Sequence, residues 1–243
     1  NKSTEKSSIG SMRGTKKTNK NKVKKGGIYQ RISEITPLNF YTKYVPVDVN
    51  DYICLINDPR NTYYKKYCVE YLNNVSNGGG TDYINVPTSV MKSMVKDSII
   101  ENESVWFGSD VGKHSHTKLG ILDDRSINYS LIFDFDVQPD KKTALESGTS
   151  YVTHAMLIKG FNFENEKKDK INKWLVENSW GKENGDNGNF VMSDTWFDKF
   201  VYEAVINKKI LNKTTEGQKI IKIYYSKDMV TLKPWDPFGS LLL

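Results

Sequence analysis

Residues 174–181 read WLVENSWG, an apolar, strand-like run that ends at Asn178 and is followed by the turn-forming Gly181. Two similar runs flank it in the chain, THAMLIKGFNF at 153–163 and GNFVMSD at 188–194, with charged and Gly- or Asn-rich turns between them. Short strands separated by turn signals at this spacing are typical of antiparallel sheets. The sequence therefore predicts a β-rich unit here, an antiparallel sheet or half-barrel.

Helices are predicted upstream of this unit. Thr36 and Pro37 form an N-cap followed by proline at the first helical position, so a short helix is expected from here to near Pro46. The clearest helix is VPTSVMKSMVKDSII at 86–100, whose Met91 and Met94 are expected to fill the core rather than to form a cofactor site.

Further strands complete the expected fold. Three runs are predicted strands: YICLIND (52–58), SVWFGSD (104–110) and LIFDFDV (131–137). Residues 63–75 fit either a helix or a strand, because their apolar residues have helical spacing but their aromatic content favours a strand. We expect the α+β class, with helix first and sheet after.

Length and composition limit the class of protein. With 243 residues, of which 37 % are hydrophobic, the chain can bury a substantial core as one large domain or two small ones. It holds no run of about 18 apolar residues, so a membrane span is not expected. The first residues are polar and basic and lack the apolar segment of a secretory signal. We expect a soluble, intracellular protein.

The positive charge is concentrated at the start of the chain. Residues 1–25 hold nine Lys or Arg and one acidic residue, whereas the other 218 residues hold 26 basic and 28 acidic side chains. Because residues 1–27 have almost no large apolar side chains, they are predicted to form a disordered arm or an insertion. Such an arm can bind nucleic acid through phosphate, or it can be a solvated insertion, since no aromatic residue lies between the lysines.

The two cysteines and the acidic or histidine clusters do not predict a metal or disulfide framework. Cys54 and Cys68 lie in apolar surroundings and are predicted to be buried free thiols. The acidic run from Asp134 through Asp136 to Asp140 has Pro139 where a calcium loop needs glycine, so its acids are expected to face water. His114 and His116 lack an obvious third ligand and are expected in a surface loop. No metal or cofactor is expected.

His154 and Asn178 form the strongest candidate site. Taken alone, each residue is best interpreted as structural: His154 as a histidine whose hydrogen bonds are made within the fold, and Asn178 as a turn residue. On neighbouring strands, however, the amide oxygen of Asn178 can accept from one imidazole nitrogen of His154 and leave the other free for a thiol. Trp180, two residues after Asn178, can cover this hydrogen bond and exclude water from it. The order His, Asn, Trp favours a catalytic pair.

These motifs resemble those of papain-like cysteine peptidases. HAML at 154–157 and ENSWG at 177–181 are similar to the family's His and Asn motifs, and an ordered series of segments between about Ile35 and Gly239 resembles the bleomycin hydrolase and aminopeptidase C family. The series comprises ITPLNFY, ICLINDPR, YCVEYLNN, VWFGSDVGKH, KLGI, THAM, KWLVENSWG, FVMSDTWFDKFVYEAVINKK and PWDPFG. The resemblance implies that residues 28–243 are the C-terminal half of such a peptidase.

The same resemblance implies roles and a missing residue. His154 would be the partner of a nucleophilic Cys, Asn178 would orient it and Trp180 would shield it. The family's catalytic Cys lies in the N-terminal half after a Gln, a context that neither Cys54 nor Cys68 has, and Ser109 is given no catalytic role. The chain starts with Asn rather than Met, so we expect a fragment that is inactive alone and needs the N-terminal half of the same protein.

The resemblance also implies assembly, location and substrates. It implies a cytoplasmic aminopeptidase without a cofactor, a homohexameric ring, and peptide substrates with a free N-terminus. The last residues, Ser240, Leu241, Leu242 and Leu243, would form an arm that enters the active-site cleft, or else a frayed tail. The alternative class is a non-catalytic scaffold, nucleic-acid-binding or regulatory, that acts through residues 1–27. The natural substrates are not predicted by this half.

Overall fold

The chain divides into two compact units, residues 1–46 and 47–243. A computed structural model describes residues 31–73, 80–135, 137–166 and 170–239, so the predicted arm at 1–27 lies outside the described residues. In the first unit, helix α1 (Pro37–Tyr44) is confirmed as predicted. The Thr36 hydroxyl accepts from the backbone N–H of Asn39 at 3.2 Å, and Pro37 stands at the first helical position.

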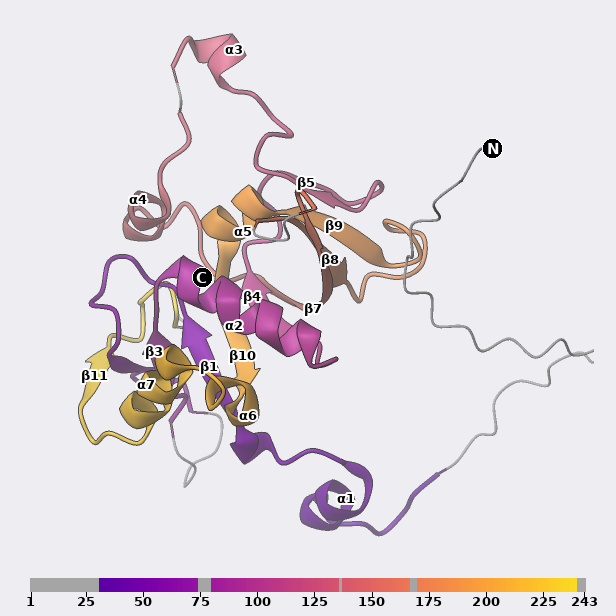
Figure 1. Cartoon of the computed structure of the whole chain (residues 1–243), viewed down its shortest axis with the longest axis vertical. Helices are drawn as coiled ribbons and strands as arrows, with labels where there is room; N and C mark the ends of the chain where they lie inside the picture. Colours follow the sequence, from indigo (N-terminus) through magenta and orange to yellow (C-terminus); the bar gives the residue numbers. More distant parts are fainter. Residues whose placement is uncertain (1–30, 74–79, 136, 167–169, 240–243) are drawn as a thin grey trace, which may run out of the picture. The chain divides into compact units, whose positions relative to one another are not determined.

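One mixed sheet organises the second unit (Figure 1). Its strands are β1 (Tyr52–Ile56), β2 (Lys66–Val69), β3 (Tyr83–Asn85), β4 (Val105–Ser109), β5 (Ser115–His116), β6 (Ile121–Leu122), β7 (His154–Phe163), β8 (Ile171–Glu177), β9 (Asn189–Ser193), β10 (Val201–Asn207) and β11 (Met229–Leu232). They lie in the order β11-β2-β3-β1-β10-β4-β7-β8-β9-β6-β5. Most neighbours are antiparallel, but β1–β3, β2–β11 and β6–β9 are parallel. The α+β class and the mostly antiparallel sheet are confirmed.

The predicted order, helix first and sheet after, is wrong. Strand β1 already begins at Tyr52, and it pairs with β10, where Tyr52 lies opposite Asn207. The central strands are therefore drawn from both ends of the unit. Local hydrophobic patterns cannot reveal such a pairing, because it joins residues far apart in the chain.

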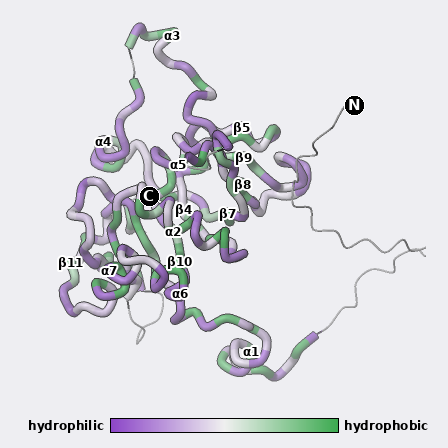
Figure 2. Tube along the Cα trace, viewed as in Figure 1, coloured by the Kyte–Doolittle hydropathy of each residue, from purple (hydrophilic) through white to green (hydrophobic). Residues whose placement is uncertain are grey.

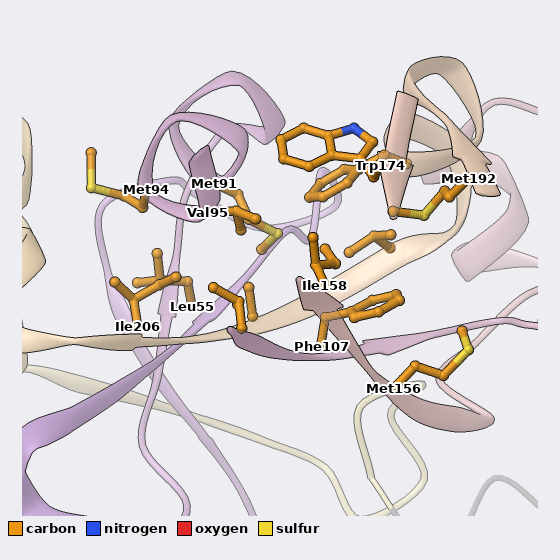
Figure 3. Close-up of a cluster of buried hydrophobic side chains, with 14 of the residues drawn as sticks. Leu55, Met91, Met94, Val95, Phe107, Met156, Ile158, Trp174, Met192 and Ile206 are labelled. Carbon is orange, nitrogen blue, oxygen red and sulfur yellow. The ribbon is translucent and has the colours of Figure 1, made fainter. Parts of the chain in front are cut away.

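Helix α2 (Thr88–Ile100) covers one face of the sheet and seals the main core. Its Met91, Met94 and Val95 are buried, as predicted, and Figure 3 shows them above side chains of the strands, including Leu55 and Phe107. Burial of one such side chain stabilises the fold by roughly 1.5–3 kcal/mol. Shorter helices and one 3-10 turn complete the unit: η1 (Val49–Asp51), α3 (Ser130–Phe133), α4 (Lys141–Glu146), α5 (Asp194–Phe200), α6 (Lys208–Leu211) and α7 (Thr215–Tyr224).

A second, smaller core lies on the opposite face of the sheet. Leu55 belongs to the main core and the next residue, Ile56, to the second, because successive side chains of a strand point to opposite faces. Leu145 of α4 and Phe238 near the described C-terminal end cover Ile56 there, and Phe238 packs edge-to-face on Tyr202. The C-terminal segment is thus part of the fold up to Gly239.

The predicted strand at 131–137 is wrong. Residues 130–133 form the short helix α3, and Leu131 and Ile132 are 83 % and 73 % exposed. Figure 1 shows α3 away from the sheet, and Figure 2 shows hydrophobic and hydrophilic residues mixed around it. Among the described residues, no strand of the sheet pairs with this segment. Asp134 also adopts a left-handed backbone, with φ at 57°, which a regular strand cannot contain.

The ambiguous segment at 63–75 contains a strand where it is described. Residues 66–69 form β2, between β3 and β11, and Tyr67 and Val69 are buried. Tyr71 has a φ of 60°, which ends regular structure there, and residues 74 and 75 lie outside the described ranges. None of the helices in the described residues combines the length and apolar character needed to span a membrane.

Candidate active site

Antiparallel pairing of β7 and β8 brings His154 and Asn178 together. His154 is the first residue of β7 and Asn178 directly follows the last residue of β8, so both lie at the same end of the strand pair. His154 Nε2 and Asn178 Oδ1 are 2.9 Å apart, a hydrogen-bond distance. The structure thus places side by side two residues that the sequence had proposed as a pair.

The backbone next to Asn178 fixes the direction of this hydrogen bond. Asn178 Oδ1 also accepts from the backbone N–H of Ser179 at 2.8 Å. A backbone N–H can only donate, so the oxygen of the amide, and not its nitrogen, faces Ser179 and His154. Nε2 of the neutral imidazole must therefore carry the proton, and Nδ1 holds the lone pair. The ring is prepared to accept a proton at Nδ1.

Asn178 itself is held in a buried position. It is only 8 % exposed, and its backbone N–H donates to the carbonyl of Gly188 at 2.9 Å. Its Nδ2 is buried and finds no hydrogen-bond partner within the described ranges. Buried polar atoms without partners are uncommon and concentrate at functional sites. Asn178 therefore uses its amide oxygen to orient His154, and its amide nitrogen is left without a hydrogen bond among the described residues.

Trp180 covers the imidazole. The rings of Trp180 and His154 are stacked, with centroids 4.8 Å apart and planes at 29°. The indole rests in turn on the buried Phe190, at 6.2 Å and 77°. Trp180 is still 37 % exposed, so it forms the outer wall of the site. By lowering the access of water, it strengthens the hydrogen bond beneath it.

Hydrogen bonds join the residues at the end of β4 to the loop before β7. Asp110 is buried, accepts from the Ser150 hydroxyl at 2.8 Å and lies 3.5 Å from the hydroxyl of Thr153. The Thr153 backbone N–H donates to the carbonyl of Ser109 at 3.0 Å, so the loop that leads into His154 is held to β4. Burial raises the pKa of Asp110, and the hydrogen bond from Ser150 is the largest effect that opposes this rise. The sequence does not predict these contacts, because no local pattern connects Asp110 with Ser150.

Neither cysteine of the chain can serve His154. Cys54 lies on β1, three strands from β7, which is about 14 Å at the usual spacing of roughly 4.8 Å. Cys68 lies on β2, two strands further away. Burial, and after it the charge of Glu203, raise the pKa of the Cys54 thiol well above its usual value. Both cysteines are free; Cys68 is buried, as predicted, but Cys54 is only partly buried.

Ser109 is the hydroxyl residue nearest to His154 in the sheet register, since the two residues are partners in the β4–β7 pair. It is fully buried, and its Oγ has no hydrogen-bond partner among the described residues. A peptide carbonyl cannot reach a side chain with no exposed surface. The structure therefore offers no nucleophilic role for Ser109.

The histidine and aspartate residues that were not expected to bind a metal differ in part from their predicted surroundings. His116 is exposed on β5, but His114 is half-buried and stacks on Phe200 at 5.8 Å, so it does not belong to a simple surface loop. Asp134 is exposed, and Asp140 caps α4 by accepting from the backbone N–H of Thr143 at 2.7 Å. Asp136 lies outside the described residues. Within these residues no three His, Cys, Asp or Glu side chains gather closely enough to bind a metal ion.

The predicted C-terminal arm, Ser240 to Leu243, lies outside the described residues. The segment before it is firmly attached. Arg60 Nη2 forms ion pairs with Asp236 at 2.9 Å and with the buried Asp58 at 2.8 Å. The described chain therefore ends close to Phe238, which belongs to the second core.

The chain is similar to known proteins over most of its length. The model of the Peptidase C1-like family matches residues 16–239, and so extends into the basic segment that the motifs had left outside. Aminopeptidase C of Listeria innocua is 41 % identical over 212 residues, which are 86 % of this chain and 46 % of the relative. Human bleomycin hydrolase is 39 % identical over 218 residues, which are 88 % and 47 % of the two chains.

A solved structure extends the likeness to the fold. The crystal structure of PepW from Lactobacillus rhamnosis HN001 matches with a TM-score of 0.77 at 41 % identity. The match covers 85 % of this chain and 45 % of that one. The chain thus spans about half the length of the relatives that it matches.

Proposed function

Because the chain belongs to the Peptidase C1-like family, we propose that it supplies the His154–Asn178 part of a cysteine aminopeptidase of the bleomycin hydrolase and aminopeptidase C type. The reactive thiol comes from a segment that this chain does not contain. The relatives' names and the 46–47 % of their length that the chain covers support this division. The substrates are peptides, hydrolysed at the bond next to a free N-terminus.

The observation that carries the proposal is the fixed direction of the His154–Asn178 hydrogen bond. With Nε2–H donated to Asn178 Oδ1, Nδ1 accepts the proton of the incoming thiol and leaves a thiolate. The thiolate attacks the peptide carbonyl, and the imidazolium returns the proton from Nδ1 to the leaving amine. Water then releases the acyl group from sulfur, with His154 as the base.

An amide suits this task better than a carboxylate would. Asn178 accepts from Nε2 without adding charge to the site, so it orients the imidazole without forming an ion pair with it. Trp180 keeps water away from the hydrogen bond during this exchange. The stacking, the buried amide and the Ser179 N–H together orient a single ring, and none of them needs a metal or cofactor.

The remaining features of the proposal concern the whole protein. The partner of this chain is the N-terminal half of the same protein, and the assembled enzyme is a cytoplasmic homohexamer. Residues 240–243 form the arm that restricts cleavage to free N-termini; the fixed Phe238 beside Tyr202 supports a defined starting point for that arm. A nucleic-acid-binding or regulatory scaffold acting through residues 1–27 is the alternative, and no contact of the described residues favours it.

The test is reconstitution. This chain is combined with an N-terminal segment that carries the family's Cys, from its own protein or from the Listeria innocua relative. Hydrolysis of an aminoacyl-coumarin amide with a free N-terminus is compared with that of its N-acetylated form. We expect activity only from the mixture and only on the free form. In the matched control, the Cys of the added segment is replaced by Ser, and activity should disappear.

Two outcomes contradict the proposal. One is a folded, assembled complex that hydrolyses neither amide. The other is hydrolysis that persists with the Cys→Ser segment. Salt-sensitive DNA binding that is lost on deletion of residues 1–27, in a complex without hydrolysis, would instead support the scaffold alternative.

A further inference from the structure

A cavity of about 240 Å³ lies between the loop after β4, helix α5 and the segment that leads into α4. His114, Tyr129 and Phe200 form an aromatic side of it, and Val137, Pro139 and Ala144 form an aliphatic side. A cavity of roughly 150 Å³ is enough to hold benzene, so this one has room for a ring and a small polar group. None of these residues contributes to the His154–Asn178 hydrogen bond.

The charged side chains that line the cavity are basic. They are Lys113, Lys141 and Lys199, and among the described residues no Asp or Glu lines it. Carboxylates lie close to two of these lysines: Asp124 pairs with Lys199 at 2.9 Å, and Asp110 interacts electrostatically with Lys113. Lys141 is largely occupied elsewhere: its Nζ donates to Asn57 Oδ1 at 2.7 Å and to the carbonyl of Val201, and burial lowers its pKa to about 7. Lys113 and Lys199 therefore supply the positive charge that a ligand meets.

These two lysines differ in how much bonding capacity they keep. Lys199 Nζ bonds to Asp124 Oδ2 at 2.9 Å and to Gln138 Oε1 at 3.1 Å, which leaves one of its three protons. Lys113 is exposed, and its Nζ makes no hydrogen bond or ion pair within the described parts of the chain. Both groups can donate and neither can accept, so they select an anionic ligand.

His114 completes the aromatic side of the cavity. Its ring stacks on Phe200 at 5.8 Å and meets the edge of Tyr129 at 5.7 Å. Its Nδ1 is buried and has no hydrogen-bond partner among the described residues. Because this nitrogen has no exposed surface, a ligand in the cavity would contact the ring of His114 and not its Nδ1.

We propose that this cavity binds a small carboxylate with an aromatic or branched aliphatic group. The carboxylate lies between Lys113 and Lys199, and the apolar group rests on Phe200 and Val137. A bare inorganic anion would leave the apolar walls uncovered, and a neutral ring would leave the Lys113 ammonium and the remaining proton of Lys199 without an acceptor. The proposal is independent of the proposed peptidase function, because it uses none of its residues.

Calorimetric titration of the full protein that contains this chain tests the site. Three probes separate the two requirements: phenylacetate has both ring and charge, benzyl alcohol has the ring alone, and acetate has the charge alone. We expect phenylacetate to bind at least about tenfold more tightly than either of the others, since only it uses both the apolar and the cationic walls. Equal affinity for phenylacetate and acetate, or no binding of phenylacetate, overturns the proposal.

Variants locate the binding. Lys113→Gln should weaken phenylacetate binding by about threefold or more and leave benzyl alcohol unchanged, because an exposed charge pair contributes modestly. Lys142→Gln, on the exposed neighbour of Lys141 that does not line the cavity, is the matched control and should change neither. Val137→Trp fills the cavity and should abolish binding, whereas His154→Ala should retain it. Loss of binding in His154→Ala but not in Val137→Trp would place the ligand at the candidate active site and refute the proposal.

Discussion

Two regions of this chain hold a half-buried histidine stacked on an aromatic ring, but in only one of these two does a hydrogen bond of known direction fix the imidazole. His154 lies 4.8 Å from the ring of Trp180, and His114 lies 5.8 Å from the ring of Phe200. Asn178 holds Nε2 of His154 in one tautomer, whereas Nδ1 of His114 is buried without a partner in the described residues. Stacking positions an imidazole, but a hydrogen bond of fixed direction decides which nitrogen reacts.

The largest expected effect is the difference in activity between variants of the two histidines. In the reconstituted enzyme, His154→Ala should lower kcat/KM by about 10³-fold, in the range that positioned acid–base groups contribute. His114→Ala, the matched control, should change it by less than about threefold, after correction for folded protein. Steady-state assays on both variants measure this. Similar losses in the two variants would mean that His154 has no special role.

The next effect tests the orienting amide. Asn178→Ala removes the acceptor for Nε2–H and should lower kcat/KM by about 10- to 100-fold, less than loss of the imidazole. Asn178→Asp keeps an acceptor and should lose less than Asn178→Ala. Asn172→Ala serves as the control, because this half-buried amide on β8 bonds to Asn162 and lies at the other end of the strand from Asn178. An Asn178→Ala enzyme with normal kcat/KM would show that the hydrogen bond is only structural.

A smaller effect is expected from the stacked indole. Trp180→Ala exposes the His154–Asn178 hydrogen bond to water and should lower kcat/KM by roughly tenfold. Trp180→Phe retains a ring over the imidazole and should recover most of that loss. Kinetics of the pair, with KM and kcat resolved, distinguish shielding from substrate binding. If Phe is no better than Ala, the ring does not act as a shield.

The smallest effect concerns acid stability at His114. Burial, and after it the charge of Lys199, lower the pKa of His114 below its usual 6.5, while Asp124 and Asp123 oppose this. The unfolded chain then binds more protons than the native state near and below pH 6.5, so His114 makes the protein less stable as pH falls through this window. Urea unfolding at several pH values between 7.5 and 5.5 gives the free energy of unfolding as a function of pH. His114→Gln should remove the contribution of His114 to its fall with decreasing pH. His116→Gln, exposed on β5, should retain it; equal slopes in all three proteins would contradict the burial argument.

The predictable features of this molecule are those set by neighbouring residues. The strands that carry His154 and Asn178 follow local patterns, and their pairing needed only one turn between them. Helix α2 and its buried Met91 and Met94 were predicted from spacing alone. The resemblance to the bleomycin hydrolase and aminopeptidase C family and the papain-like fold are confirmed by the family model and by PepW.

The features that sequence analysis missed depend on distant contacts. The segment at 131–137 alternates like a strand, but its described residues pair with no strand of the sheet, so its pattern predicts the wrong structure. Asp110 and Ser150 bond across 40 positions, and His114 is packed by Phe200 from a later helix. A hydrophobic pattern records which face of a segment is apolar, but not what covers it.

The position of β1 between β3 and β10 has a consequence for how the chain folds. The centre of the sheet forms only when Tyr52 pairs with Asn207, which is far away in the sequence. Pairings between such distant residues slow folding. The β7–β8 hairpin, by contrast, joins adjacent segments and can form early. In pulsed hydrogen exchange during refolding, amides of β7 and β8 should gain protection before those of β1 and β10. The proposed catalytic pair would then be assembled on a hairpin that exists before the sheet that later holds it in place.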